Sequence, residues 1–230
     1  MSHTKEKKKS KSENTKKLIQ ESALGLFRRK SFHTTSMREI SAEAGVALGA
    51  TYYYFQSKEE IVMDWYQATF NESVAKAEEI AKENRKLGER LDLFLQHKLQ
   101  QLEGHEPLCL VIAASSLNLG NTISPFGPKT EALRDASIAM FQTLYKGSDI
   151  RASQKLEPIV PKILWLFQMA LIWFWSIDSS RGKTRTELLK NKGIKLLIAY
   201  LKFSKLPLLS SINQLTLEIF EVAESHANSK

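Results

Sequence analysis

The residue types best suited to chemistry lie close together, between positions 36 and 58. Three consecutive tyrosines, Tyr52, Tyr53 and Tyr54, precede Lys58, and Arg38 stands upstream of them. Tyrosine hydroxyls and an ammonium group can bind phosphate oxygens, and an arginine can donate two hydrogen bonds to one guanine. Successive residues of a helix point about 100° apart, so three consecutive tyrosines cannot all lie in a core. At least one is therefore exposed, which beside Lys58 favours an interface over an aromatic core run.

Two short helices with a glycine between them would position these residues. The sequence predicts one helix over 36–44 and a second over 48–54, and Gly45 between them can adopt the left-handed conformation that ends a helix. Three side chains have a spacing that could pack the two helices together: Ile40, Val46 and Thr51. The pattern is that of a helix-turn-helix, whose second helix can enter a DNA major groove.

The stretch Thr35–Ile61 resembles the DNA-binding domain of the tetracycline-repressor family. The matching pieces are Ala44-Gly45-Val46, Gly49, Tyr52-x-Tyr54-Phe55 and Ser57-Lys58-Glu59-Glu60, with Phe27 and Phe32 upstream. The resemblance covers residues 14–63, about a quarter of the chain, and is highly specific for a short pattern. It implies an all-α fold with an N-terminal three-helix helix-turn-helix domain and a C-terminal helical domain that binds a ligand and dimerises.

The resemblance also implies which residues contact DNA. Positions that usually contact the DNA backbone correspond to Ser36, Tyr52, Tyr53, Tyr54 and Lys58, and positions that face base edges correspond to Arg38, Leu48, Gly49 and Ala50. The sequence departs from the family at Ala47, where a Ser or Thr cap is usual, at Leu48, where a polar residue is common, and at Thr51, which replaces a Leu. The second helix is therefore poor in hydrogen-bond donors, and the operator sequence does not follow from it.

Hydrophobic periodicity predicts helices throughout the rest of the chain, without an alternating strand pattern. Capping boxes, in which a Ser or Thr and a Glu three residues later pair with each other's backbone, mark three helix starts: Ser36–Glu39, Ser57–Glu60 and Thr184–Glu187. The expected helices lie near 14–30, 36–44, 48–54, 58–83, 87–104, 107–119, 128–146, 156–178, 184–204 and 208–225.

The predicted organisation is a basic disordered arm over 1–13, the helix-turn-helix domain over 14–57, and the ligand-binding and dimerisation domain over 58–230. The net charge is +8, and the first seventeen residues hold seven lysines against two glutamates. Such an arm could contact phosphates, or it could be a solvated tail that aids solubility.

The C-terminal domain has no signature as sharp as the helix-turn-helix. In the family that the sequence resembles, the last two long helices pair with a partner subunit, which here points to 156–178 and 184–204. The first of these helices is apolar nearly all round and rich in aromatic residues. Its candidates for lining a ligand pocket are Trp165, Gln168, Met169 and Trp175. For each of them, packing in the core or against a partner subunit is the alternative.

The same helix needs a membrane test. Residues 163–177 are fifteen uncharged residues in a row. As a helix they span roughly 22 Å, short of the ~30 Å hydrocarbon core of a bilayer. We therefore expect a helix buried in protein. The single cysteine, Cys109, allows no intramolecular disulfide, which suits the cytoplasm.

Three classes of function remain to be compared. A regulator released from its operator by a small apolar or aromatic molecule fits the helix-turn-helix best, although the sequence does not separate repressor from activator. A helical scaffold or membrane-surface protein with a basic arm is a second class. An enzyme is a third, but the chain has no Gly-x-Ser-x-Gly, phosphate-binding glycine loop or Cys-x-x-Cys. The five histidines form no metal-binding spacing, and no cofactor is expected.

Overall fold

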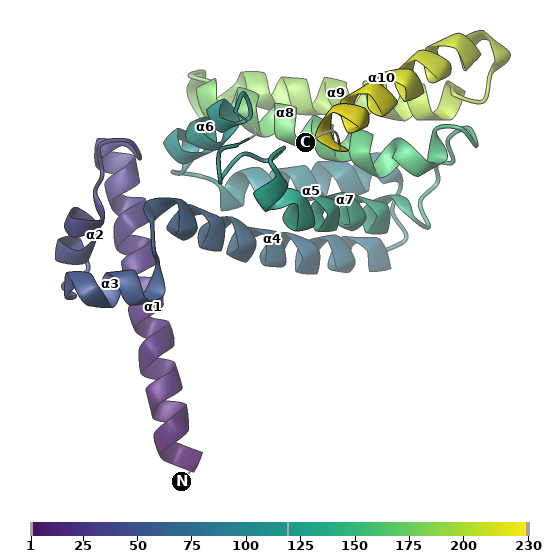
Figure 1. The fold of residues 1–230 in the computed structure, drawn as a ribbon. Helices are drawn as coiled ribbons and strands as arrows, with labels where there is room; N and C mark the ends of the chain where they lie inside the picture. Colours follow the sequence, from purple (N-terminus) through teal and green to yellow (C-terminus); the bar gives the residue numbers. More distant parts are fainter. Residues whose placement is uncertain (1, 119, 229–230) are drawn as a thin grey trace. The chain divides into compact units, whose positions relative to one another are not determined.

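The computed structural model describes residues 2–118 and 120–228, with side chains over 12–118 and 120–222. These residues form helices joined by short connections, with no strand among them, so the predicted all-α fold is confirmed (Figure 1). The helices are α1 (Ser2–Lys30), α2 (Met37–Glu43), α3 (Leu48–Tyr54), α4 (Lys58–Lys82), α5 (Leu87–Gln101), α6 (Glu106–Ser115), α7 (Glu131–Tyr145), α8 (Val160–Ile177), α9 (Thr184–Phe203) and α10 (Ser210–Asn228). Single 3₁₀ turns are η1 (Pro128–Thr130), η2 (Glu157–Ile159), η3 (Arg181–Lys183) and η4 (Pro207–Leu209).

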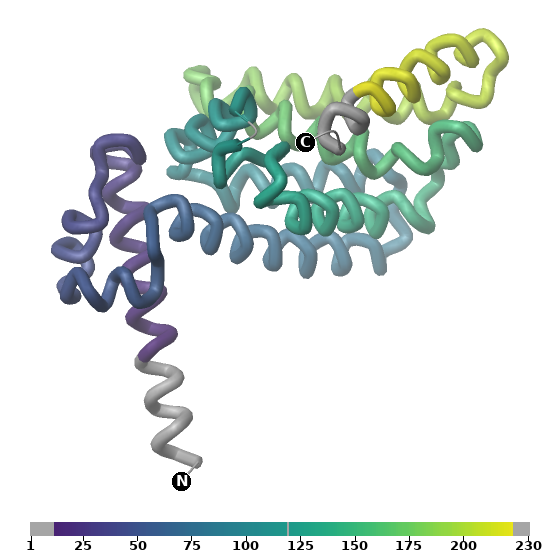
Figure 2. Tube along the Cα trace, in the orientation of Figure 1, coloured from purple at the N-terminus to yellow at the C-terminus, as the bar shows by residue number. Residues whose placement is uncertain are grey.

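The chain forms two compact units, which are described separately. The first contains Met1–Asn71 and Leu102–Leu133, and the second contains Glu72–Gln101 and Arg134–Lys230. Helix α4 contributes residues to both. These units differ from the functional domains predicted at 14–57 and 58–230, which stay predictions. Helix α1 begins at Ser2 rather than near 14. The side chains of residues 1–11 lie outside the described part (grey in Figure 2), so the basic disordered arm over 1–13 also stays a prediction.

The first unit has a core shared by helices from both of its segments. Ile19, Ala23 and Phe27 of α1 are at most 2% exposed, and Ile40 of α2 and Ile61 of α4 are fully buried. Helix α6 packs against α1, which the sequence pattern did not predict. The aromatic residues around the end of α1 close this core, because the Phe27 and Phe32 rings meet edge to face at 5.2 Å.

The second unit is built around α5, α7, α8 and α9. The rings of Phe94 on α5 and Phe141 on α7 meet edge to face at 5.4 Å. Gly193 lets α9 approach α8 closely, because a Cβ at this position would lie 2.4 Å from the Phe167 ring. The buried Lys190 ammonium pairs with Asp92 of α5 at 2.8 Å, which ties α9 to α5. These contacts place α9 beside both α5 and α8.

The start of α9 is capped differently from the prediction. The Thr184–Glu187 capping box is wrong, since the N-cap is Lys183 in the left-handed region and no side chain caps from that position. Instead the Asp178 carboxylate accepts hydrogen bonds from the Thr186 N–H and hydroxyl, at 2.9 and 2.7 Å. Burial disfavours the charged form of Asp178, but the hydrogen bonds from Ser180 and Thr186 outweigh it and lower its pKa.

Helix α8 is buried on one side only. Its buried residues are Val160, Pro161, Leu164, Trp165, Gln168, Leu171, Trp175 and Ser176. On the other side, Trp173 is 60% exposed and Ile177 is 58% exposed. By length and composition the segment Glu157–Ile177 could also cross a membrane, with 44% of its apolar window buried among the described helices. The expectation of a helix buried in protein is therefore met within one chain on one side of α8.

Candidate nucleic-acid interface

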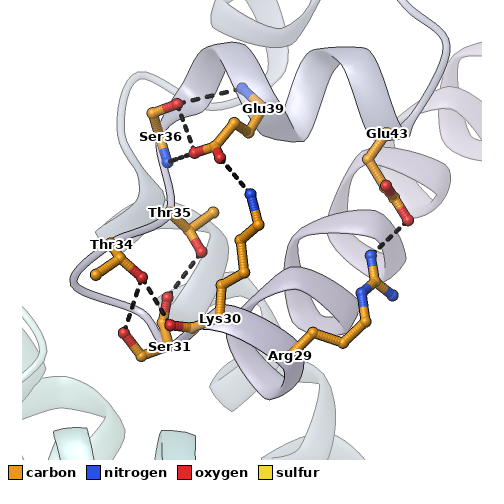
Figure 3. Close-up of polar contacts among 8 residues, drawn as sticks. All are labelled: Arg29, Lys30, Ser31, Thr34, Thr35, Ser36, Glu39 and Glu43. Atoms are coloured by element: carbon orange, nitrogen blue, oxygen red, sulfur yellow. Dashed lines mark hydrogen bonds and ion pairs between the residues drawn. The ribbon is translucent and has the colours of Figure 1, made fainter.

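The first helix of the helix-turn-helix is held at its start by a complete capping box (Figure 3). The Ser36 N–H donates to Glu39 at 2.9 Å, and the Glu39 N–H donates to the Ser36 hydroxyl at 3.3 Å. The second Glu39 oxygen accepts from the Lys30 ammonium at 2.7 Å, so α1 is tied to α2. The hydrogen bond from Lys30, followed by those from Ser36, lowers the pKa of Glu39 to about 2.

A second ion pair fixes the far end of α2. The Arg29 guanidinium lies 2.6 Å from the Glu43 carboxylate, again joining α1 to α2 (Figure 3). In the connection between the two helices, the Thr35 hydroxyl donates to the Ser31 carbonyl at 2.7 Å. These contacts hold α2 at both ends, so its exposed side is presented in one orientation.

The turn between α2 and α3 follows the prediction. Gly45 has φ +62°, the left-handed conformation in which a side chain would be strained. Where α2 and α3 pack, the Ser41 and Thr51 hydroxyls lie 2.8 Å apart, the Ser41 hydroxyl also lies 2.8 Å from the Met37 carbonyl oxygen, and Thr51 is fully buried. The hydroxyl of Thr51 thus gives the buried Ser41 hydroxyl a second polar partner beside the Met37 carbonyl, which a leucine at position 51 would not supply.

The predicted DNA-contacting residues differ in how far they are exposed. Tyr53 is 78% exposed and Tyr52 is 41% exposed, so the tyrosine run is not a core element. Four more residues are exposed or half-buried on the same two helices: Arg38, Leu48, Gly49 and Ala50. Tyr54 is half-buried, and its hydroxyl lies 3.1 Å from the Ser12 hydroxyl of α1. Ser36 is exposed but has its side chain in the capping box.

Lys58 has partners that the sequence pattern did not indicate. Its ammonium donates to the carbonyl oxygens of Phe32, His33 and Thr35 at 2.8, 3.2 and 3.2 Å. It also lies 4.5 Å from the centre of the Phe32 ring. The three ammonium hydrogens thus hold the connection between α1 and α2. In this structure the side chain holds the loop before Ser36, and the phosphate contact that the resemblance implies for it stays a prediction.

Sequence reasoning missed the ion pairs that orient α2. The lysine and arginine at the end of α1 looked like ordinary charges at a helix C-terminus. Their partners are Glu39, nine residues after Lys30, and Glu43, fourteen residues after Arg29, so no helical spacing rule links them. Only the angle between α1 and α2 brings these charges together.

Helix α6 adds a contact near the start of α4. The Trp65 ring of α4 and the His105 ring, at the N-cap of α6, lie 5.2 Å apart. Burial, and next the nearby positive charge of Arg28, lower the pKa of His105. This imidazole therefore stays neutral at the pH where an exposed histidine begins to charge.

The four predicted ligand-pocket residues lie on α8 in the second unit. Trp165, Gln168 and Trp175 are at most 6% exposed, and Met169 is half-buried. The Gln168 Oε1 atom is buried and has no hydrogen-bond partner among the described residues. Such an atom is costly unless a partner reaches it. The Gln168 amide thus has one buried acceptor oxygen available for a hydrogen bond.

A groove elsewhere in this unit has none of these four residues in its lining. It has a volume of about 540 Å³ and lies between α5 and α9. Its lining includes the apolar residues Ile194, Ile198 and Phe203 and charged residues such as Glu89 and Lys195. Among the described residues, no group of three or more His, Cys, Asp or Glu could hold a metal ion.

Comparison with known families covers most of the chain. Residues 19–63 match the family described as "Bacterial regulatory proteins, tetR family". Residues 90–216, more than half of the chain, match "Tetracyclin repressor-like, C-terminal domain". The "Fatty acid metabolism regulator protein" of Bacillus subtilis is 24% identical over 151 residues, which are 60% of this chain and 75% of that protein.

Solved structures have the same fold. A tetR-family transcriptional regulator from Streptomyces coelicolor has a TM-score of 0.62 at 17% identity, over 90% of this chain and 89% of its own. The Bacillus subtilis regulator FadR, solved in complex with stearoyl-CoA, has a TM-score of 0.58 at 19% identity, over 79% and 96% of the two chains. The Thermus thermophilus repressor FadR, solved in complex with lauroyl-CoA, has a TM-score of 0.58 at 18% identity, over 83% and 95%.

An N-terminal and a C-terminal segment of the chain thus match one family. In the helix-turn-helix, the ion pairs from α1 hold α2, and α2 and α3 have exposed residues. The family resemblance predicted from the sequence is confirmed: the chain belongs to the tetracycline-repressor family of dimeric, ligand-responsive, DNA-binding transcriptional regulators.

Proposed function

We propose that this protein represses its target genes from a pseudo-palindromic operator and leaves the DNA when an acyl-CoA thioester binds its C-terminal domain. The observation that carries the DNA-binding part is that Arg38 of α2 and Tyr53 of α3 are both exposed on the helix-turn-helix. Tyrosine hydroxyls and the N–H groups of the turn suit phosphate oxygens, and Arg38 suits a guanine edge. A helix-turn-helix dimer reads two half-sites about 34–36 Å apart.

The ligand class rests on α8 and on the relatives. Trp165 and Trp175 give the buried side of α8 an apolar, aromatic character, which suits an acyl chain, and the Gln168 Oε1 atom offers an acceptor. Two structural relatives were solved with lauroyl-CoA and stearoyl-CoA, and a sequence relative is named for fatty acid metabolism. An acyl-CoA is therefore the small apolar molecule that we favour over an aromatic one.

Ligand binding affects DNA binding only when the two states differ in ligand affinity. Helix α4 contributes residues to both compact units, and Trp65 near its start touches His105. We propose that a displacement of α4 changes the spacing of the two recognition helices. Typical coupling of about 1–3 kcal/mol would weaken DNA binding by roughly 5- to 150-fold. The homodimer would form through the exposed sides of α8 and α9, and the protein would act in the cytoplasm, where the DNA is.

The test is fluorescence anisotropy with DNA from the region flanking the protein's own gene. Lauroyl-CoA and stearoyl-CoA should weaken binding at least fivefold, whereas free CoA should not. Gln168→Leu should reduce this response without changing DNA affinity in the absence of ligand. The matched control is Ile198→Trp. This substitution fills the groove between α5 and α9, which Gln168 does not line. Specific DNA binding that no acyl-CoA changes would refute the ligand assignment and leave the DNA-binding assignment standing.

A further inference from the structure

The groove between α5 and α9, called here the α5–α9 groove, has positive charge that no carboxylate neutralises. The charged residues in its lining are Lys86, Glu89, Asp92, Asp149, Lys195 and Lys202. Two of the acids are engaged within the unit, since Asp92 pairs with Lys190 at 2.8 Å and Asp149 accepts the Leu87 N–H at 2.8 Å. The other four side chains, three lysines and one glutamate, have no ion pair or hydrogen bond among the described residues. The free ammonium groups thus outnumber the free carboxylate.

Apolar side chains of α9 line the same groove. Ile194 is 7% exposed, Ile198 is half-buried one turn later, and Phe203 is 55% exposed at the end of the helix. Opposite them α5 has no side chain, because a Cβ at Gly88 would lie 3.7 Å from Ile198 and 3.8 Å from Ile194. From Ile194 to Phe203 the axis of α9 advances by about 13 Å. The groove therefore has an apolar strip that is two to three helical turns long.

The free lysines come from both sides of the groove. Gly88 at the start of α5 lies beside Ile198. Asp92, one turn further along α5, pairs with Lys190, which is two turns earlier on α9, so the two helices run antiparallel. The lysine directly before α5 therefore lies toward the end of the groove where α9 carries Lys202. An anionic group in the groove would meet ammonium groups from both of its sides.

The α5–α9 groove lies on a different side of α9 from the proposed homodimer interface. Leu196, which is 72% exposed, belongs to the exposed side of α9 that we assign to that interface. Leu196 and Ile198 are two residues apart, so on a helix they point roughly 160° away from each other. A second subunit that covers Leu196 therefore leaves the groove open to another partner.

The chemistry of the groove indicates its occupant. An amphipathic helix binds in a groove of this kind through apolar side chains at positions i, i+4 and i+7, and the charges beside them select the partner. Nucleic acid would satisfy the lysines through its phosphates but has no aliphatic stripe to cover Ile194 and Ile198. We propose that the α5–α9 groove docks an acidic amphipathic helix of a partner protein. This interaction goes beyond the DNA and ligand binding of the proposed function and depends on neither.

The first experiment uses a fluorescein-labelled peptide of about 18 residues, roughly 27 Å long as a helix, with leucines along one side and glutamates on both flanks. One control peptide has lysines in place of the glutamates, and another has serines in place of the leucines. In fluorescence anisotropy, the leucine–glutamate peptide should bind the full-length protein at least tenfold more tightly than either control. Equal affinity for all of these peptides would overturn the inference. Displacement of the peptide by lauroyl-CoA would also overturn it, because the groove would then be a site for a small amphipathic anion.

The second experiment tests whether the lysines of the groove hold the peptide. Lys195→Glu/Lys202→Glu reverses two charges in the groove and should raise the peptide dissociation constant at least tenfold. The matched control is Lys82→Glu/Lys155→Glu, which changes the net charge equally at two exposed lysines outside the groove lining. This control should leave the constant within twofold. If both variants lost affinity equally, binding would follow net charge alone and the assignment to the groove would fail.

Filling the groove tests its apolar part. Ile198→Trp fills it from α9, and Gly88→Met fills it from α5, so one of the two variants can serve if the other folds poorly. Each should raise the peptide dissociation constant at least tenfold, with melting followed by circular dichroism as the control for folding. Unchanged peptide affinity in a variant that melts like the unsubstituted protein would refute the inference. DNA and acyl-CoA are absent from the variant measurements, so failure of the proposed function would be recognised on its own.

Discussion

Replacing Lys58 distinguishes a residue that positions the helix-turn-helix from one that contacts phosphate. The Lys58→Met variant keeps most of the aliphatic chain over Phe32 but removes the ammonium and its three hydrogen bonds to carbonyl oxygens. A hydrogen bond to a charged group contributes roughly 1.5–3 kcal/mol, and bonds that share one ammonium in a half-buried site are not additive. We therefore expect the free energy of unfolding to fall by about 2–4 kcal/mol.

For a chain of this size, such a loss lowers the melting temperature by roughly 5–15 °C. Melting is followed by circular dichroism, and DNA affinity is measured from 50 to 200 mM salt. Because Ser36 follows the loop that Lys58 holds, the variant should bind all sequences more weakly. The slope of log affinity against log salt should nevertheless stay the same, whereas a lost phosphate contact would reduce it by about 0.9.

A matched control is Lys17→Met, which removes the same charge from a side chain that is 73% exposed. This control should melt within about 1 °C of the unsubstituted protein, because exposed ion pairs contribute little. If Lys58→Met left the melting temperature unchanged and reduced the salt slope, the positioning role would be refuted. The phosphate contact suggested by the family resemblance would then be the better description.

Three further outcomes test the site. Arg38→Ala should change the preferred base at one position of each half-site, whereas Tyr53→Phe should weaken binding to all sequences alike. Both effects are measured with a library of operator variants. The reverse result would exchange the roles of the two residues. Lys30→Met should raise the pKa of Glu39 from about 2 toward its ordinary value of 4.5, as followed by NMR. The lowered pKa of Glu39 stabilises the folded state above pH 4.5, and this contribution is lost as the pH falls toward 2. Because the variant lacks most of this contribution, it should also unfold at a higher pH during acid titration. Thr51→Val should lower the free energy of unfolding by about 0.5–1.5 kcal/mol, since it removes one buried hydrogen bond while the Ser41 hydroxyl keeps the Met37 carbonyl as its acceptor. An unchanged chemical-denaturation midpoint would contradict this.

The sequence by itself determined the helices and the helix-turn-helix. Their signals are local: apolar residues at helical spacing, a glycine suited to φ +62°, and the Ser36–Glu39 capping box, whose partners are three residues apart. The observed helices accordingly match the expected ones except at their ends. The exposure of at least one tyrosine of the run also followed from local geometry, because consecutive residues cannot share one side of a helix, and the structure shows that Tyr52 and Tyr53 are the exposed ones.

Only the tertiary structure decided which partners these residues have. Lys58 meets carbonyl oxygens more than twenty residues earlier in the chain, and Asp178 replaces the expected cap of α9 across a turn. The aromatic residues of α8 divide into a buried and an exposed side according to where α9 lies, which depends on the close approach at Gly193. Such contacts depend on the angles at which helices cross, and these angles result from packing of whole surfaces rather than from the spacing of any few residues.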